Sequence, residues 1–309
     1  MKRRTFRVEG AGVGRAVVDA VAQELGLPVE QARGLVDVGA VYVAGRRCRD
    51  AKTRLVSGQV VAVVLEEGGH SSLAEAPPAP TFRVLHEDAE VLAVDKPAGL
   101  PAQPTEARVG GSLVDQVSAY LGREAGLVHR LDRETSGVTV FGKVARATSA
   151  LAAEFREGRA RKRYVAATGP GVPASGTVDL PLSKDPSRPG RWRATRAANG
   201  VPALTHFRTV YSGAEFCVVE LLPQTGRTHQ LRAHLTALGA PILGDSRYGG
   251  AAKAGGVDVA RCLLHAQALE LAHPSTGKPL HVEAPVPEDL LRFFTLAGVE
   301  VPRGPVPEK

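Results

Sequence analysis

The nine-residue stretch His129–Gly137, HRLDRETSG, runs directly into the apolar run Val138–Phe141, VTVF. Its β-branched and aromatic residues predict a strand over Val138–Phe141. The polar stretch is then a loop at a strand end, a place where binding and catalytic residues often lie. Arg130 and Arg133 flank Asp132, and nearby positive charge favours an ionised carboxylate, which suits a nucleophile. The same spacing also fits an aspartate that caps a turn or pairs with a surface arginine.

The segments around this loop predict a mixture of strands and helices without a regular βαβ repeat. We expect strands at Val84–His86, Val91–Val94, Tyr164–Ala167, His206–Tyr211 and Phe216–Leu222, and helices at Ala145–Phe155 and Thr228–Leu238. The spacing of Ser112 and Asp115 is that of a capping box, which predicts a further helix reaching Leu121. This order favours an α+β domain with a mainly antiparallel sheet.

A smaller module precedes this domain. Periodic hydrophobicity stops at Glu66–Pro80, where Gly, Ser, Ala, Pro and acidic residues take over. We therefore expect a small α+β module over residues 1–66, a linker over residues 67–80 and the larger domain over residues 81–309. Within the module, the apolar spacing predicts two helices, Val13–Leu25 and Val29–Val38, and strands at Val41–Val43, Leu55 and Val60–Val64.

The charge of the chain is positive and clustered. Lys and Arg number 39 against 32 Asp and Glu, a net charge of +7. Local excesses of +5, +5 and +4 fall within residues 1–65, 143–163 and 184–196. Such clusters are either solvated surface or contacts to a polyanion, and three of them favour a groove for nucleic-acid phosphates.

Several classes of protein are disfavoured. No apolar run approaches the roughly 18 residues of a membrane span, and no apolar signal segment follows Met1, so we expect a cytoplasmic protein without a membrane partner. The three cysteines are scattered, and His229 and His234 are five residues apart, so we expect neither a disulfide framework nor a metal site. The glycine-rich phosphate-binding patterns are missing, and no cofactor is expected.

HRLDRETSG resembles the signature loop of the RluA-type pseudouridine synthases, in which the aspartate is the catalytic nucleophile. Further blocks resemble the same family in the same order, at Asp95–Leu100, Arg161–Ala166, Leu222–Leu235, Pro241–Asp245, Tyr248-Gly249, Leu264–Ala266, His273-Pro274 and Ala284-Pro285. The N-terminal module is similar to the small αL, S4-like RNA-binding domain, most clearly at Leu35–Gly45. Ala44 stands where that module usually has Asn, and Gln103 replaces a His of the catalytic domain.

The resemblance implies a pseudouridine-synthase fold preceded by an RNA-binding module, acting as a monomer without a cofactor. It implies isomerisation of uridine to pseudouridine in structured RNA, with large-subunit ribosomal RNA as the first expectation. Asp132 would be the nucleophile, Arg227 would hold it ionised, and Tyr164 would stack on the flipped uracil and help to move the proton from carbon 5. Contacts to RNA are expected from Arg130, which fills the space that the base leaves, Leu231, which packs on the uracil, and Arg33, Arg161 and Lys162.

Two other functions remain open at this point. One is an RNA-binding or ribosome-assembly protein without catalytic activity on the same fold. The other is a hydrolytic glycosidase that uses Asp132. Such enzymes usually place two carboxylates about the bond, and Glu134 is the neighbouring carboxylate in the sequence.

Overall fold

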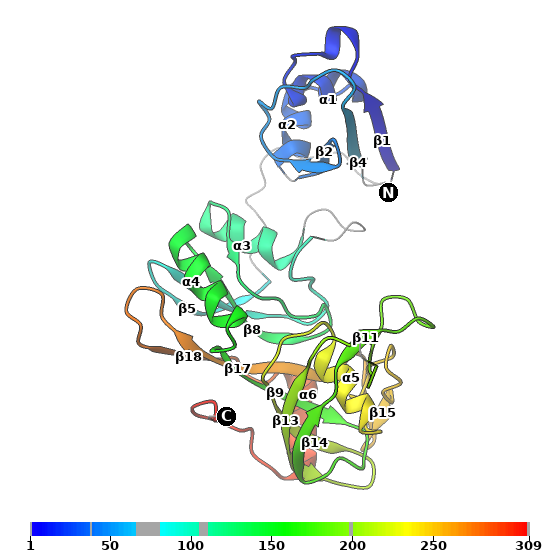
Figure 1. Ribbon diagram of the computed structural model, residues 1–309, viewed down its shortest axis with the longest axis vertical. Coiled ribbons are helices and arrows are strands. Elements are labelled where there is room, and N and C mark those ends of the chain that lie inside the picture. Colours follow the sequence, from blue (N-terminus) through cyan, green and yellow to red (C-terminus); the bar gives the residue numbers. More distant parts are fainter. Residues whose placement is uncertain (1, 38, 66–80, 105–110, 198–199, 308–309) are drawn as a thin grey trace. The chain divides into compact units, whose positions relative to one another are not determined.

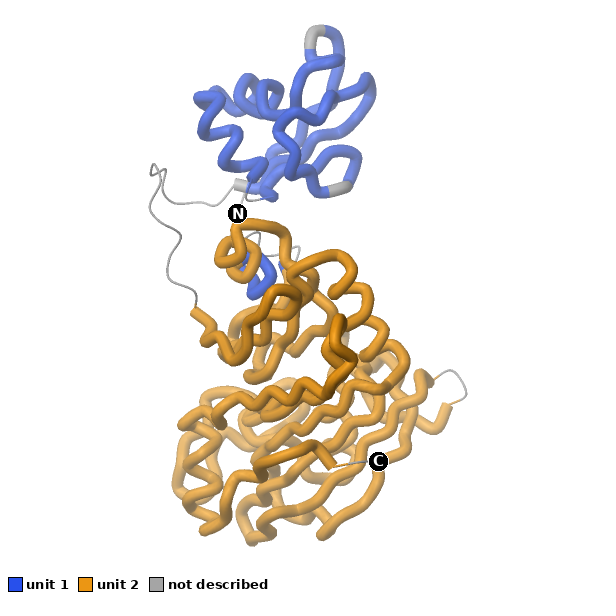
Figure 2. Tube along the Cα trace, turned by 90° about the vertical axis from the view of Figure 1, so that its left-hand side faces the viewer, with its two compact units in different colours: residues 1–78, 104–115 blue, residues 79–103, 116–309 orange. Residues whose placement is uncertain are grey.

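The computed structural model describes residues 2–37, 39–65, 81–104, 111–197 and 200–307. The chain forms two compact units, one of residues 1–78 and 104–115 and the other of residues 79–103 and 116–309 (Figures 1 and 2). The predicted linker, residues 67–80, lies outside the described residues. Over the described ranges, none of the helices has both the length and the apolar character that a membrane crossing requires.

The first unit packs two helices against a small antiparallel sheet. The strands are ordered β1-β4-β2-β3 and span Lys2–Arg7 (β1), Val41–Val43 (β2), Arg46–Cys48 (β3) and Val60–Leu65 (β4). The two helices span Val17–Leu25 (α1) and Val29–Asp37 (α2). A 3-10 turn over Gly10–Gly12 (η1) precedes α1. Helix α1 starts four residues later than predicted, because Val13 and Gly14 form a turn and Ala16 makes an isolated β-bridge to Arg54. The strand predicted at Leu55 is wrong: this residue lies in a loop and is fully buried in the core.

The turn between β2 and β3 has a backbone conformation that suits asparagine better than alanine at position 44. Ala44 and Gly45 both have positive φ, 50° and 77°. Two central residues with positive φ are typical of a type I′ hairpin turn, in which Asn-Gly is the favoured pair. Ala44 therefore occupies a left-handed conformation that costs an alanine more than an asparagine.

The second unit is built on a ten-stranded sheet, and it confirms the predicted α+β class with mainly antiparallel pairing. The main order is β10-β13-β14-β9-β17-β8-β6-β5, with β18 paired to β17 and β7 to β8. These strands span Arg83–Glu87 (β5), Val91–Lys96 (β6), Gly126–Leu127 (β7), Ser136–Gly142 (β8), Arg161–Thr168 (β9), Ser175–Asp179 (β10), Leu204–Ser212 (β13), Cys217–Pro223 (β14), Leu264–Ala272 (β17) and Pro279–Glu283 (β18). Two short hairpins lie outside the sheet: Leu182–Lys184 (β11) with Trp192–Ala194 (β12), and Lys253–Ala254 (β15) with Val257–Asp258 (β16).

Helices cover this sheet (Figure 1). They span Leu113–Leu121 (α3), Ala145–Arg156 (α4), Gln230–Ala237 (α5) and Glu288–Ala297 (α6). One core packs α5 and α6 against β9 and β14, and the other packs α4 against β6, β8 and β17. The predicted capping box is confirmed, because the Asp115 carboxylate accepts hydrogen bonds from the Ser112 amide and hydroxyl, and Ser112 Oγ accepts one from the Asp115 amide.

A parallel pairing of β8 and β17 joins the two halves of the sheet, and it requires a glycine. Gly137 pairs with Ala266 at φ 116°, and a Cβ on Gly137 would lie 2.2 Å from the Ala266 carbonyl oxygen. Beside it, the Ser136 hydroxyl and His265 Nδ1 are 2.9 Å apart. The last two residues of the HRLDRETSG stretch therefore fix the loop at this junction, and Asp132 precedes it by four residues.

Candidate active site

A buried lysine supports the loop that carries Asp132. Lys96, at the end of β6, is fully buried, and its Nζ donates to the carbonyl oxygens of Pro97 (2.9 Å), Leu100 (2.8 Å) and Arg133 (3.2 Å). The Gly99 amide donates to the same Arg133 carbonyl at 2.8 Å. Burial lowers the pKa of Lys96 to about 8. One side chain thus ties the loop after β6 to the loop that carries Asp132.

The beginning of the loop is held by a neutral histidine. His129 stacks on Phe155 of α4, with ring centroids 4.3 Å apart. Its Nε2 accepts a hydrogen bond from the Val140 amide at 3.0 Å, so the proton of the neutral ring is on Nδ1. Burial lowers the pKa of His129 to about 3, which keeps the ring neutral at physiological pH. Asp132 therefore lies between two fixed ends.

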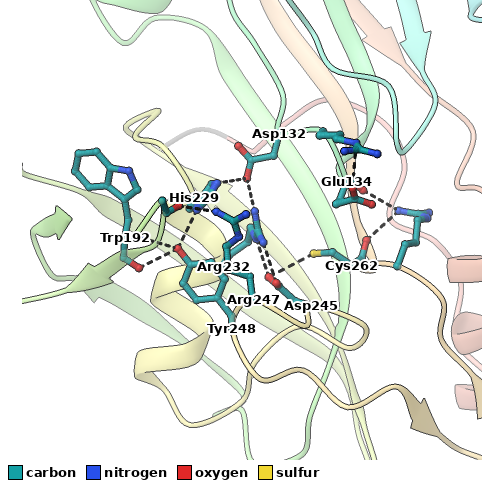
Figure 3. A network of polar contacts seen from close by, with 12 residues as sticks. Asp132, Glu134, Trp192, His229, Arg232, Asp245, Arg247, Tyr248 and Cys262 are labelled. Carbon is teal, nitrogen blue, oxygen red and sulfur yellow. Dashed lines mark hydrogen bonds and ion pairs between the residues drawn. The ribbon is translucent and has the colours of Figure 1, made fainter. Parts of the chain in front are cut away.

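The Asp132 carboxylate is held by Arg232 of α5 (Figure 3). Arg232 Nη1 donates to Asp132 Oδ2 at 3.1 Å, while Nε and Nη2 donate to the two oxygens of Asp245 at 2.7 and 2.8 Å. Burial alone would lower the pKa of Arg232, but the hydrogen bonds and charge of Asp245 outweigh it, and the pKa is raised. A guanidinium fixed by one carboxylate orients the other, because its donors form a rigid planar fork. The Asp132 side chain remains 27% exposed.

This contact corrects the predicted role of Arg227. Its side chain is exposed, and its Nε donates to the Pro202 carbonyl at 3.1 Å instead of contacting Asp132. The Arg227 amide bonds to the Gln230 side chain at 3.0 Å, which places Arg227 in the loop before α5. Arg232 follows five residues later, inside α5, and its side chain is buried. Helical spacing gave no signal for it, because Arg227, four residues before Leu231, lies closer to the apolar stripe than Arg232 does.

A pocket of about 100 Å³ opens beside Asp132. Most of the residues predicted for the site line it, namely Arg130, Asp132, Lys162, Tyr164, Arg227 and Leu231. Arg161 is not among them, because successive residues of a strand face opposite sides. Its side chain pairs with Glu270 of β17. Arg33 belongs to the first unit, where it pairs with Glu30 at 3.8 Å.

Tyr164 and Leu231 give the pocket its apolar surface. Tyr164 comes from the middle of β9, and Leu231, 6% exposed, comes from the first turn of α5. Burial and the charge of Asp132 raise the pKa of the Tyr164 phenol, so the ring is protonated at neutral pH. An aromatic ring and an aliphatic side chain on one small pocket suit a planar base.

A second chain of polar contacts ends at Asp132, and no sequence pattern predicted it. His229 Nε2 lies 3.8 Å from Asp132 Oδ2, and His229 Nδ1 lies 3.0 Å from the Tyr248 hydroxyl. That hydroxyl is also 2.9 Å from the carbonyl oxygen of Trp192 and 3.0 Å from its amide. His229 has a left-handed backbone, φ 56°, and α5 therefore begins at Gln230, two residues later than predicted.

The chemistry available to the pocket follows from its single acid. Among the described residues that line it, Asp132 is the one carboxylate. Glu134 does not line it; its side chain pairs with Arg133 at 3.5 Å and is 42% exposed. A hydrolytic glycosidase needs a second carboxylate about the bond, so this geometry favours a lone nucleophile. Over the same described ranges, no group of three or more His, Cys, Asp or Glu side chains is arranged to hold a metal ion.

Comparisons with known proteins agree with this geometry. A family model described as RNA pseudouridylate synthase matches residues 90–237. Ribosomal large subunit pseudouridine synthase D of Xanthomonas campestris is 35% identical over 299 residues, which cover 90% of this chain and 87% of that protein. An uncharacterized RNA pseudouridine synthase of Mycobacterium bovis is 34% identical over 308 residues, covering 94% of this chain and 96% of that protein.

A solved structure gives the same result. The protein called human RNA pseudouridylate synthase domain containing 4 superposes with a TM-score of 0.58 at 28% identity, covering 71% of this chain and 94% of that chain. The signature loop, the sheet and the relatives agree. The chain therefore belongs to the RluA-type family of RNA pseudouridine synthases, isomerases that convert uridine in RNA to pseudouridine.

Proposed function

We propose that this enzyme isomerises uridine in large-subunit ribosomal RNA and that Asp132 is its nucleophile. The observation that supports Asp132 as the nucleophile is the contact between Arg232 and Asp132, since it orients a carboxylate that lines a pocket of about 100 Å³. The RNA class is supported by the relative from Xanthomonas campestris, whose name specifies the large ribosomal subunit.

The target uridine must first leave its helix. A base inside a duplex does not present its glycosidic bond to a side chain, and flipping it out costs a few kcal/mol. Arg130 is exposed at the rim of the pocket and fills the space that the base leaves. The flipped uracil packs between Tyr164 and Leu231, where aromatic stacking contributes ~1–3 kcal/mol.

Asp132 then attacks the nucleoside, at the anomeric carbon or at carbon 6 of the ring, and the bond between nitrogen 1 and the anomeric carbon breaks. Arg232 keeps the carboxylate ionised and oriented during this step. The uracil rotates within the pocket, carbon 5 bonds to the anomeric carbon, and the Asp132 carboxylate is released. Carbon 5 finally loses its hydrogen as a proton, and nitrogen 1 gains one.

The remaining basic residues hold the RNA. Lys162 and Arg227 lie at the pocket and contact phosphates next to the target nucleotide. Arg33 and Arg161 contact RNA away from the pocket, and the first unit, with its excess of basic residues, recruits the RNA as an S4-like domain. In this proposal one copy of the chain suffices, because every side chain assigned to the chemistry comes from the second unit.

The test compares Asp132→Asn with Glu134→Gln on a transcript of large-subunit ribosomal RNA. An amide keeps the shape of the carboxylate but is not a nucleophile. We expect Asp132→Asn to form no pseudouridine while binding the transcript like the parent. Glu134→Gln, which removes the neighbouring carboxylate, should keep the parent rate. Turnover by Asp132→Asn within tenfold of the parent would exclude Asp132 as the nucleophile.

A further inference from the structure

We propose that His229 is the catalytic base that removes the hydrogen from carbon 5 of uracil in the last step of the isomerisation. This inference rests on the proposed function, since it needs Asp132 to have released the C-glycoside. The observations that carry it are the position of His229 at the pocket and the hydrogen bonds that decide which of its nitrogens is protonated.

His229 is placed to reach the reacting atoms. It lines the same pocket as Asp132, and its Nε2 lies 3.8 Å from Asp132 Oδ2 (Figure 3). In the product, carbon 5 is bonded to the anomeric carbon. A group next to the nucleophile on the pocket wall is therefore within reach of carbon 5 once the new bond has formed.

The hydrogen bonds of Tyr248 determine the tautomer of His229. The Tyr248 hydroxyl is hydrogen-bonded to two backbone groups of Trp192, the amide at 3.0 Å and the carbonyl oxygen at 2.9 Å. The amide can only donate a hydrogen bond and the carbonyl can only accept one. The single hydroxyl proton of Tyr248 therefore goes to the Trp192 carbonyl. His229 Nδ1, 3.0 Å from the same oxygen, must then carry a proton and donate it to Tyr248. The neutral ring is left with an unprotonated Nε2 facing the pocket.

The charges around His229 keep its ring neutral. Burial lowers the pKa of His229, and the positive charges of Arg232 and Arg247 act in the same direction. The negative charges of Asp132 and Asp245 oppose them and are outweighed. A neutral imidazole with a free lone pair is a competent base at physiological pH.

The surroundings also fix the ring in place. The guanidinium groups of Arg191 and Arg232 lie over the Tyr248 ring, 4.8 and 4.9 Å from its centroid, which holds the tyrosine that orients His229. The left-handed backbone of His229 is uncommon for a residue other than glycine. Such strained residues cluster at functional sites, where the surrounding structure enforces them.

The other group near the base is a poorer acceptor. Tyr164 faces the uracil, but burial and the charge of Asp132 raise the pKa of its phenol. Its oxygen therefore keeps its proton and is a much weaker base than imidazole. We accordingly assign proton removal, which the family resemblance implied for Tyr164, to His229 and leave Tyr164 the stacking role.

The step is balanced without a co-reactant. The bond between carbon 5 and its hydrogen breaks, and the proton goes to His229 Nε2. The electron pair of that bond forms the double bond between carbons 5 and 6. The π pair of the double bond between carbon 6 and nitrogen 1 moves to nitrogen 1, and the single bond between these two atoms remains. Nitrogen 1 takes a proton from water, and His229 returns its proton to water, so that product and substrate are isomers.

The experiment uses His229→Asn and a substrate RNA that carries deuterium at carbon 5. The asparagine amide nitrogen occupies the place of Nδ1 and keeps the bond to Tyr248, but leaves no base at Nε2. Since general bases contribute typically 10²- to 10⁴-fold, we expect the single-turnover rate to fall by at least roughly 10²-fold. We also expect a larger deuterium isotope effect than in the parent, because proton removal becomes rate-limiting. The control is His206→Asn, since His206 lies on β13 and does not line the pocket. This variant should have the single-turnover rate and the isotope effect of the parent.

A second variant, Tyr248→Phe, tests the assignment independently in case His229→Asn does not fold. Tyr248→Phe removes the acceptor of the Nδ1 proton, so the ring partly takes the opposite tautomer; a lower rate with a raised isotope effect is expected. Parent rates and isotope effects in His229→Asn or in Tyr248→Phe would overturn the assignment. If Asp132→Asn is inactive while His229→Asn equals the parent, only the base is misassigned. If Asp132→Asn is active, the proposed function itself fails.

Discussion

Replacement of Arg232 by lysine tests how the nucleophile is held. Arg232 reaches Asp132 with one nitrogen and Asp245 with two, at 3.1, 2.7 and 2.8 Å. A lysine has a single ammonium and cannot span both carboxylates in this geometry. We expect it to remain with the buried Asp245, so that Asp132 loses its oriented donor while the interior keeps a counter-ion.

The size of the effect follows from the removal of one hydrogen bond. A hydrogen bond to a charged group is worth about 1.5–3 kcal/mol. With about 1.4 kcal/mol for each factor of ten in rate, Arg232→Lys should slow the chemical step by roughly 10- to 150-fold. Arg232→Ala should in addition lower the folding stability by about 3–5 kcal/mol, because it leaves the buried Asp245 carboxylate without its counter-ion.

The assay is single-turnover pseudouridine formation at saturating enzyme, with thermal unfolding measured beside it. Arg227→Lys is the matched control, since Arg227 lines the same pocket but bonds to the Pro202 carbonyl. We expect Arg227→Lys to keep the parent rate at saturation and to bind RNA somewhat less tightly. A parent-like rate in Arg232→Lys together with a large drop in the rate of Arg227→Lys would refute the role of Arg232.

Four further outcomes are expected. Ala44→Asn should stabilise the first unit against urea by up to about 1 kcal/mol, since it relieves a left-handed alanine; unchanged stability contradicts the turn argument. Gly137→Ala should destabilise the second unit by at least about 1–3 kcal/mol in thermal unfolding, because its Cβ meets the Ala266 carbonyl. Burial lowers the pKa of His265 to about 4, so the unfolded chain binds its proton first and stability should fall as the pH drops from about 6.5 to about 4; His265→Gln should flatten that decline. A chain starting at Thr81 should bind RNA more weakly, and its slope of log K against log salt should be shallower by roughly 0.7 to 0.9 for each phosphate that the first unit neutralises in the full chain; equal slopes contradict RNA binding by the first unit.

The long strands and helices were predictable because their side chains repeat over several residues. The apolar run Val138–Phe141 lies within β8, and the run Tyr164–Ala167 lies within β9. Short strands such as β3, β11 and β15 have two or three residues, too few for a period to be recognised. The 3-10 turn before α1 was not predicted, because its glycines disfavour a helix without excluding one.

The candidate site was predicted in its residue types but not in all its contacts. A family motif identifies Asp132, yet it does not say which of two nearby arginines turns inward. Helical spacing does not separate them in favour of Arg232, whereas strand alternation would have separated Arg161 from Tyr164. The contact of His229 with Tyr248 joins α5 to a loop nineteen residues away, and no local pattern encodes it.

The most direct measurement maps pseudouridines in large-subunit ribosomal RNA from three strains. One carries the parent gene, one lacks it, and one carries Asp132→Asn expressed at the parent level. We predict that at least one uridine is modified in the first strain and unmodified in the other two. The same modification pattern in the parent and Asp132→Asn strains would contradict the assignment of Asp132, and an unchanged map in the strain without the gene would contradict the proposed substrate.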